Sequence, residues 1–326
     1  IYRENRVLTS DIMNKIKYRL IVPLFIVSFV VLFPLCNDTN TINSINQNSL
    51  ELSSSYFEEG FSLFLEGKYN EAIKKFDKAI AINPNDKDAW VTKGASYFQL
   101  ENDVKALECF DKAIAIDPNF VLAWYYKGNV LHTQGKINDS LESYNKAIAI
   151  DPNYAPPWGK KGIILNELER YNEAISCFDK YLEIEPQDGY IWFQKGNSLY
   201  STNKYLEAIS SYNKSIEIES NNPLAYNNRG LIYILLKDYT SALSDLNKAI
   251  ELAPLNYHPY YVRGTVYYNL EEYEKAIKDF TKSIQMNPQF GPSYFMRGLV
   301  YYTTGDYVKA ELDYNKACRL EPNLCN

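Results

Sequence analysis

The chain has 326 residues, of which 46% are hydrophobic and 23% are charged, and its formal net charge is -6 at pH 7. The first 36 residues carry a net positive charge, so the net charge of the remaining residues is more negative than that of the whole chain. The lysines of this remaining part recur at even spacing and do not cluster. Such a surface repels a phosphate backbone, so composition argues against nucleic acid as a partner. Length by itself leaves the architecture open, and the spacing of the apolar residues must indicate it.

The N-terminal segment has the pattern of a targeting sequence. Residues 1–12 precede the first methionine, and we interpret them as non-native or upstream sequence. In the segment 13–36, basic residues lead into an apolar stretch from Leu20 to Leu35, which is typical of a signal sequence or short membrane anchor. A helix of that stretch would span roughly 24 Å, short of a hydrocarbon core about 30 Å thick. A buried core helix is the alternative interpretation.

The flanks of this segment indicate where the rest of the chain lies. The positive end is expected to stay cytoplasmic, so we expect a membrane-anchored or exported chain whose body is extracytoplasmic. Leu35 stands where a lipoprotein signal has a small residue before its cysteine, so cleavage, lipidation and retention of the segment all stay open. Residues 37–52, rich in Asn, Ser and Thr, are predicted to form a polar linker.

A period of 34 residues runs without insertion from Ser53 to Leu324 and gives eight repeats. Position 4 of each repeat is aromatic and holds all four tryptophans of the protein, and position 8 is always glycine. Position 20 is alanine or serine, and position 32 is proline in every repeat except the fifth. The repeats comprise residues 53–86, 87–120, 121–154, 155–188, 189–222, 223–256, 257–290 and 291–324.

These positions predict a pair of helices in each repeat. Positions 4, 8 and 11 form one stripe of a first helix, and positions 20, 24 and 27 form one stripe of a second. Glycine at 8 and a small residue at 20 let the two antiparallel helices approach closely, and the aromatic residues at 4 and 24 are expected to fill the space beside them. Proline at 32 ends the second helix. A single hairpin cannot bury its apolar face, so the hairpins must stack.

The pattern of a position-4 aromatic, Gly at 8, Ala at 20, an aromatic at 24 and Pro at 32 resembles the tetratricopeptide repeat family. The resemblance covers the whole range 53–324. It implies an all-α fold, an α-α superhelix (solenoid) of eight 34-residue helical hairpins. It also implies a right-handed superhelix whose concave groove, lined by first helices, binds a peptide or a helix of a partner.

Position 7 is charged in every repeat, although it lies on the core-facing stripe of the first helix. In four repeats, the residue at position 23 has the opposite charge. Repeat 1 has Glu59 at position 7 and Lys75 at position 23, and repeats 6 to 8 have arginine at position 7 and aspartate at position 23. Where position 7 is lysine, position 23 is Cys or Ser. We therefore predict ion pairs within each hairpin, half-exposed and worth roughly 0 to 1 kcal/mol, that select helix register. Independent solvated charges are the alternative.

The opposite face of the first helix is the candidate binding surface, because in the family this face lines the groove. Positions 5, 9 and 12 there offer aromatic rings for stacking and amides that hydrogen-bond a peptide backbone. Asn129 and Asn197 are the strongest candidates, because packing in an apolar core does not explain an asparagine. For several of the aromatic rings, packing against neighbouring repeats is the alternative role. The candidates are Tyr125, Asn129, His132, Asn166, Phe193, Asn197, Tyr200, Tyr261, Tyr268, Phe295 and Tyr302.

The sequence offers no convergent set of catalytic groups. It has only two histidines, His132 and His258, and no nucleotide-binding or metal-binding motif, so we predict no enzymatic activity, no cofactor and no metal. Cys109 and Cys177 are expected to be small core residues. A disulfide between Cys318 and Cys325 is an open alternative to a buried thiol at Cys318.

The leading hypothesis is a protein-protein interaction scaffold or adaptor that binds a peptide or a partner helix in the concave groove. One alternative is a self-associating structural subunit of an envelope assembly, which would form a homo-oligomer through the uncapped C-terminal repeat. Another is the repeat arm of a longer enzyme. The expected partners are a protein or peptide and, through the N-terminal segment, a membrane.

Overall fold

The computed structural model describes the backbone of residues 39–325 and the side chains of residues 48–324. The predictions for residues 1–12 and 13–36 therefore lie outside the described residues. The described part is all-helical, with sixteen α-helices, no strand and a closing 3-10 turn, η1 (Pro322–Cys325). None of these helices is both long enough and apolar enough to traverse a bilayer.

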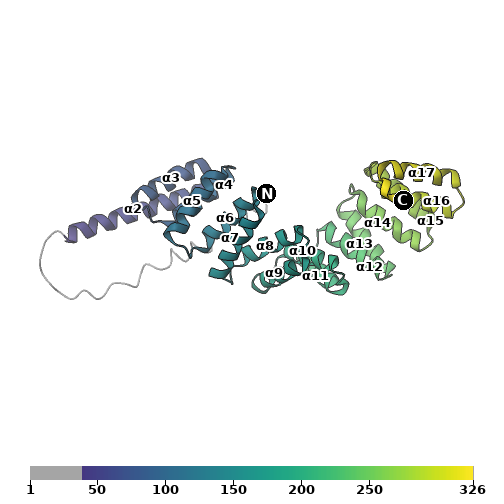
Figure 1. Cartoon of the computed structure of the whole chain (residues 1–326), viewed down its shortest axis with the longest axis horizontal. Helices are drawn as coiled ribbons and strands as arrows, with labels where there is room; N and C mark the ends of the chain where they lie inside the picture. Colours follow the sequence, from purple (N-terminus) through teal and green to yellow (C-terminus); the bar gives the residue numbers. More distant parts are fainter. Residues whose placement is uncertain (1–38, 326) are drawn as a thin grey trace. The chain divides into compact units, whose positions relative to one another are not determined.

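The helices pair into eight hairpins, one for each predicted repeat (Figure 1). This confirms the predicted fold class. Hairpins 1 to 4 are α2 (Thr39–Leu65) with α3 (Tyr69–Ile82), α4 (Lys87–Gln99) with α5 (Asp103–Ile116), α6 (Val121–Thr133) with α7 (Ile137–Ile150), and α8 (Ala155–Glu167) with α9 (Tyr171–Ile184). Hairpins 5 to 8 are α10 (Gly189–Ser201) with α11 (Tyr205–Ile218), α12 (Pro223–Leu235) with α13 (Tyr239–Leu252), α14 (Tyr257–Asn269) with α15 (Tyr273–Met286), and α16 (Gly291–Thr303) with α17 (Tyr307–Leu320).

The chain divides into two compact units, Ile1–Asp151 and Pro152–Asn326. Hairpins 1 to 3 belong to the first unit and hairpins 4 to 8 to the second. Within each unit, a second helix packs on the first helix of its own hairpin and on the first helix of the next, and successive first helices also touch one another. Side chains from neighbouring first helices can therefore meet on one face of each unit.

The first helix of hairpin 1 is longer than the repeat requires. It begins at Thr39, so residues 39–52, expected to be a polar linker, are helical. No proline or glycine interrupts this stretch, and polar residues alone do not end a helix. The buried hydroxyl of Ser53 donates a hydrogen bond to the carbonyl of Ala79 at 3.0 Å, which fixes α2 against the end of α3.

In hairpins 1 to 5 and 7, the core is a fully buried ring at position 24 that packs on the glycine at position 8. Phe178 is fully buried, and a Cβ placed on Gly162 would lie only 2.6 Å from its ring. Hairpin 6 carries Leu246 in this place, where the corresponding distance from Gly230 is 3.2 Å. Glycine is thus required by the close approach of an aromatic ring, and less so where the ring is absent.

The tryptophans at position 4 are half-buried, and Trp158 and Trp192 pack against a core cluster, in agreement with the expectation that position 4 fills the space beside the helices. Each indole N–H donates to the carbonyl of the proline that precedes it by six residues, as Trp90 does to Pro84 at 2.9 Å and Trp158 to Pro152 at 3.0 Å. Position 4 therefore ties the first helix to the turn that leads into it.

The turn inside each hairpin requires a left-handed residue at position 15. Three hairpins have glycine there, whereas the other five hold residues such as Glu169 (φ 57°) and Lys237 (φ 61°). A side chain in this conformation costs roughly 1–2 kcal/mol relative to the right-handed helix. Periodicity alone did not reveal this requirement, because the five residues are three glutamates, one asparagine and one lysine, and glutamate and lysine do not favour this conformation.

Replacing Lys237 by glycine should therefore stabilise the protein. We expect the free energy of unfolding to rise by about 0.5–1 kcal/mol, the relief of strain less the entropy that glycine loses on folding. Urea unfolding followed by circular dichroism measures the change. Lys74→Gly, in the middle of the exposed face of α3, is the control and should lower stability by about 1 kcal/mol. A loss of stability in Lys237→Gly would contradict the argument.

Candidate functional site

The predicted position-5 rings belong to the core. Tyr125 is 3% exposed and Phe193 is 8% exposed, and each packs on the position-24 ring of its own hairpin, with Phe193 and Tyr212 centroids 6.0 Å apart. Tyr261 and Phe295 are half-buried and make the same contact with their own position-24 rings. Because Tyr125 and Phe193 have almost no accessible surface, the structure does not support direct contact of either ring with a partner.

The position-12 side chains lie near the turn of each hairpin. Tyr200, Tyr268 and Tyr302 each contact the tyrosine five residues later, at centroid distances of 6.0, 6.1 and 5.4 Å. Tyr302 is 58% exposed, whereas Tyr200, Tyr268 and His132 are half-buried. These side chains keep accessible surface, so their role as groove residues stays a prediction.

Asn129 and Asn197 have a structural role that the sequence analysis missed. The hydroxyl of Tyr144 donates to Asn129 Oδ1 at 2.7 Å, and the hydroxyl of Tyr212 donates to Asn197 Oδ1 at 2.8 Å. Repeats 3 and 5 alone combine asparagine at position 9 with tyrosine at position 24. This combination in the sequence could have predicted the hydrogen bond, because the hydroxyl of a buried tyrosine needs an acceptor for its proton. Burial also raises the pKa of Tyr212.

Asn197→Ala should consequently destabilise the protein, because the hydroxyl of Tyr212 loses the acceptor of its proton. We expect the free energy of unfolding to fall by about 1–3 kcal/mol. The double variant Asn197→Ala/Tyr212→Phe removes both partners and should recover most of that loss. Chemical unfolding of the three variants completes the cycle, and a double variant as unstable as Asn197→Ala would show that the hydrogen bond is not the cause.

A chain of amides joins successive first helices of the second unit. Ser198 Oγ donates to Asn166 Oδ1 at 2.8 Å, which links α10 to α8. Asn228 Nδ2 donates to Asn197 Oδ1 at 3.0 Å, which links α12 to α10. Asn227 Nδ2 donates to Asn228 Oδ1 at 3.1 Å, within α12. We call Asn166, Asn197, Asn227 and Asn228 the amide cluster; Asn227 is buried and the other three are half-exposed.

Two members of the amide cluster, Asn227 and Asn228, were not among the predicted site residues. They occupy positions 5 and 6 of repeat 6. The other repeats have side chains of several different types at these positions, so the sequence pattern does not indicate an amide there. Only the stacking of α10 on α12 brings them to Asn197. The cluster therefore depends on contacts between repeats, which a 34-residue period does not describe.

His258 continues this chain onto α14. Its Nδ1 lies 3.3 Å from Asn227 Oδ1, and its ring lies among Tyr257, Tyr261 and Phe290, with centroids 6.1 to 6.5 Å away. Burial lowers the pKa of His258, because the apolar surroundings disfavour the imidazolium. The folded protein thus holds this histidine neutral at neutral pH.

His258 should make stability depend on pH. Its pKa is lower in the folded state than in the unfolded state, where it is about 6.5, so the unfolded state binds more protons below neutrality. Its contribution is full above about pH 6.5 and is lost as the pH falls through the folded pKa. Urea midpoints of the wild type should fall relative to those of His258→Gln between pH 7.5 and 5, and parallel midpoints would contradict the assignment.

The arginine ion pairs form within hairpins, as predicted, but they are more buried than expected. Arg263 Nε and Nη2 donate to both carboxylate oxygens of Asp279 at 2.7 and 2.8 Å, and the carboxylate is 4% exposed. Arg229 with Asp245 and Arg297 with Asp313 repeat this geometry, and Glu59 pairs with Lys75. The prediction of half-exposed pairs is therefore wrong for the three arginines.

The lysines at position 7 pair differently, which corrects the prediction that all contacts stay within a hairpin. Three of the four lysines reach an aspartate at position 25 of the preceding hairpin: Lys195 reaches Asp179 at 2.6 Å, and Lys93 with Asp77 and Lys127 with Asp111 both lie at 2.7 Å. The residue at that position before Lys161 is Asn145. In the arginine repeats that position is neutral, and Arg263 Nη1 donates there to Asn247 at 2.6 Å. For every position-7 cation except Lys161, a carboxylate thus stands at one of two positions, either 23 of its own repeat or 25 of the preceding one.

The cysteines with described side chains are either buried thiols or disulfide-bonded. Cys109 and Cys177 are buried, and burial raises the pKa of each thiol to about 11, so both stay protonated. Cys318 takes part in a disulfide, and the side chain of Cys325, its predicted partner, lies outside the described residues. Among the described residues, no three His, Cys, Asp or Glu side chains gather in a way that could hold a metal ion.

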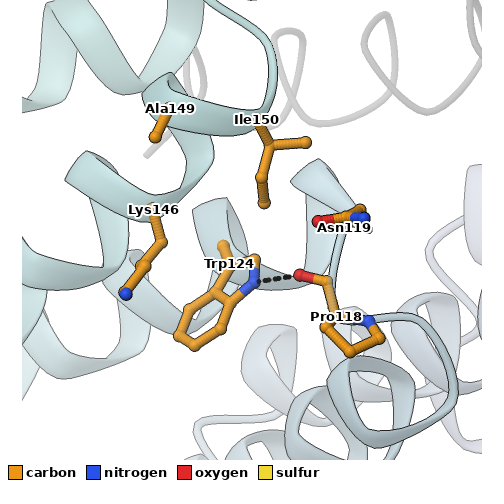
Figure 2. A pocket seen from close by; sticks show the side chains of 6 residues that line it. All are labelled: Pro118, Asn119, Trp124, Lys146, Ala149 and Ile150. Atoms are coloured by element: carbon orange, nitrogen blue, oxygen red, sulfur yellow. Dashed lines mark hydrogen bonds between the residues drawn. The ribbon is translucent and has the colours of Figure 1, made fainter.

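An open pocket lies in hairpin 3, in the first unit (Figure 2). Its walls come from the turn before α6, from α6 itself and from the end of α7. The indole N–H of Trp124 donates to the carbonyl of Pro118 at 2.9 Å across one side of it. The lining residues are Pro118, Asn119, Trp124, Lys146, Ala149 and Ile150.

Sequence models of one repeat family match most of the repeated region. Those described as tetratricopeptide repeat match residues 88–120, 121–154, 143–176, 223–256, 259–290 and 292–324. Those described as TPR repeat match residues 60–101 and 196–237. No curated protein matches the chain in sequence.

Several solved structures share the fold. pilF of Pseudomonas aeruginosa is 18% identical with a TM-score of 0.57, over 64% of this chain and 94% of that one. The APC/C hetero-tetramer Cut9-Hcn1 is 17% identical with a TM-score of 0.52, over 88% of this chain and 58% of the other. MamA is 25% identical with a TM-score of 0.47, over 50% of this chain and 95% of its own.

Proposed function

Because the chain belongs to the tetratricopeptide repeat family, we propose that it is a protein-interaction scaffold that binds an extended polypeptide across the amide cluster. The proposal places the partner on the face that α8, α10 and α12 share within the second unit. The family supports polypeptide binding in general. The contacts of the amide cluster support this particular face.

The orientation of Asn166 is the observation that carries the proposal. Its Oδ1 accepts from Ser198 Oγ, so its amide NH2 points away from that bond, and no described residue accepts from it. The side chain is half-exposed, so this donor is available to a carbonyl of a partner. A fixed amide that presents donors recognises a peptide backbone without selecting its side chains.

Neighbouring side chains extend the same surface. Asn197 Nδ2 lies 3.4 Å from Gln194 Oε1, and Gln194 Nε2 donates to the hydroxyl of Tyr190 at 2.7 Å. Tyr190 is 38% exposed, so it offers both a ring and a hydroxyl beside the amides. Tyr200 supplies a second half-buried ring on α10. Hydrogen-bonding amides beside accessible tyrosines are the combination expected for recognition of an extended segment.

Selection of a displayed peptide library on the purified full chain tests the proposal. Asn166→Ala is the preferred variant, because Ser198 Oγ also donates to the carbonyl of Gln194 and stays satisfied. We expect it to weaken selected peptides about three- to tenfold, the effect of one hydrogen bond. The control Asn172→Ala changes an exposed amide on α9 and should leave affinity unchanged. Peptides that bind both variants like the wild type would contradict the proposed face.

We also propose that the repeats lie outside the cytoplasm. The support is the basic and apolar segment 13–36, whose pattern is that of an export signal or anchor. Fusion of alkaline phosphatase after residue 52 tests this, because the enzyme becomes active only after export. An inactive fusion would place the repeats in the cytoplasm.

Self-association through hairpin 8 is a second candidate function. Val308 and Leu312 lie one helical turn apart on α17 and are 73% and 64% exposed. An exposed valine also occurs at the equivalent place of hairpin 2, where Val104 is 67% exposed, so Leu312 is the distinguishing residue. Light scattering of the wild type and of Leu312→Lys tests this candidate, and a wild-type monomer at all concentrations removes it.

A further inference from the structure

The pocket in hairpin 3, here called the Trp124 pocket, has an apolar wall with a cation at its rim (Figure 2). The one polar group of the Trp124 indole, its N–H, donates a hydrogen bond to the carbonyl of Pro118, so only the ring surface faces the pocket. Ile150 and Ala149 add aliphatic surface from the end of α7. Lys146 brings an ammonium to the same opening, and its side chain is exposed.

The charge of Lys146 is not neutralised by any described side chain. It forms no ion pair with any residue whose side chain the structure describes. Lys127 also lies over the indole, 5.6 Å from its centroid, but its ammonium is paired with Asp111. The pocket therefore combines a ring, aliphatic groups and one available positive charge, which together suit an anion attached to an apolar body.

Other hairpins show what happens when the same lysine is paired. In hairpin 4 the equivalent lysine, Lys180, forms an ion pair at 2.8 Å with Glu183. In hairpin 5 Lys214 does the same with Glu217. Those glutamates stand at the position of Ala149. A single difference, alanine for glutamate three residues after the lysine, leaves the charge of Lys146 available.

Hairpin 2 repeats the Trp124 pocket residue for residue. Its sequence has the same six residue types at the same six repeat positions, including a tryptophan, a lysine and the alanine. These residues are Pro84, Asn85, Trp90, Lys112, Ala115 and Ile116. The first unit thus carries two copies of one residue pattern on consecutive hairpins.

We propose that the Trp124 pocket and its copy in hairpin 2 bind a carboxylate carried next to an apolar side chain on a peptide segment of a partner protein. The apolar side chain packs on the indole and on Ile150, and the carboxylate pairs with Lys146. This site is separate from the amide cluster, which belongs to the second unit, so neither site depends on the other. An exposed ion pair contributes modestly, so millimolar affinity for a single peptide group is expected.

Nuclear magnetic resonance of the indole N–H groups of the full chain tests the proposal, because the protein has only four tryptophans. The probes are N-acetylphenylalanine, which carries a terminal carboxylate, N-acetylaspartylphenylalaninamide, which carries a side-chain carboxylate, and N-acetylphenylalaninamide, which carries none. Trp124→Phe and Trp90→Phe assign the two signals. We expect at least one acid to shift both signals saturably below about 10 mM, and the uncharged amide to bind about fivefold more weakly.

In Ala149→Glu, the new carboxylate can form with Lys146 the ion pair that Glu183 forms with Lys180 in hairpin 4. It should weaken acid binding about fivefold at Trp124 and leave Trp90 unchanged, so the second pocket serves as an internal control for folding. Lys146→Gln should have the same effect, whereas Lys180→Gln should have none. The acid that binds more tightly identifies a terminal or a side-chain carboxylate as the natural group.

Three results would overturn the proposal. One is the absence of a shift at Trp124 with either acid. Another is equal binding of acid and amide, which would leave only an apolar contact. The third is an Ala149→Glu variant that binds the acids as tightly as the wild type, because the charge of Lys146 would then play no part.

Discussion

Asp279→Ala is expected to lower the free energy of unfolding by about 3–5 kcal/mol. Asp279 is almost fully buried and accepts two hydrogen bonds from Arg263, so its removal leaves a largely buried guanidinium without a carboxylate, in contact with Asn247 and with the rings of Tyr260 and Tyr267. Guanidinium chloride unfolding measures the loss. The variant Arg263→Met/Asp279→Leu removes both charges and should recover much of it, because a buried ion pair is replaceable by apolar packing.

A lysine repeat provides the matched control. Asp179→Ala also removes the carboxylate that faces a position-7 cation, but that carboxylate is 45% exposed and Lys195 can turn toward water. Its expected cost is about 0–1 kcal/mol. Equal losses in the two variants would show that burial does not distinguish the arginine pairs from the lysine pairs.

Gly162→Ala is expected to destabilise the protein by about 2–3 kcal/mol, although alanine is the better helix former. The new Cβ would lie 2.6 Å from the ring of Phe178, which is fully buried and has no room to move away. Thermal unfolding followed by circular dichroism gives the shift in midpoint. The result would show that position 8 is glycine because of the ring across the hairpin.

Hairpin 6 offers the comparison for that variant. In Gly230→Ala the Cβ meets Leu246 at 3.2 Å, a flexible side chain that can shift, so the gain in helix propensity should offset most of the contact. We expect a change within about 0.5 kcal/mol. Phe178→Leu should also rescue part of the loss in Gly162→Ala. A Gly230→Ala variant as unstable as Gly162→Ala would indicate that backbone approach, and not the ring, sets the requirement.

Whether the role of a candidate site residue could be predicted from the sequence depended on where its contacts lie along the chain. Tyr125 and Phe193 were predicted to face a partner because position 5 falls on the face opposite the core stripe, yet both rings fold onto position 24 of their own hairpin. Asn197 was predicted to contact a partner because an apolar core does not explain it. Its explanation, the hydroxyl of Tyr212, lies 15 residues away on the second helix. Helical periodicity gives the side of a helix and not the depth to which a side chain is covered.

By itself, the sequence determined the helices, their pairing and the number of hairpins, because a small residue, an aromatic residue or a proline recurs every 34 residues and each acts within one hairpin. It also determined that Arg263 pairs with Asp279, since both belong to one repeat. Only the tertiary structure decided that Lys195 turns to the preceding hairpin and that the amide cluster forms across α8, α10 and α12. The physical reason is that these outcomes depend on the distance between side chains of separate hairpins, which stacking fixes and a repeat pattern does not contain.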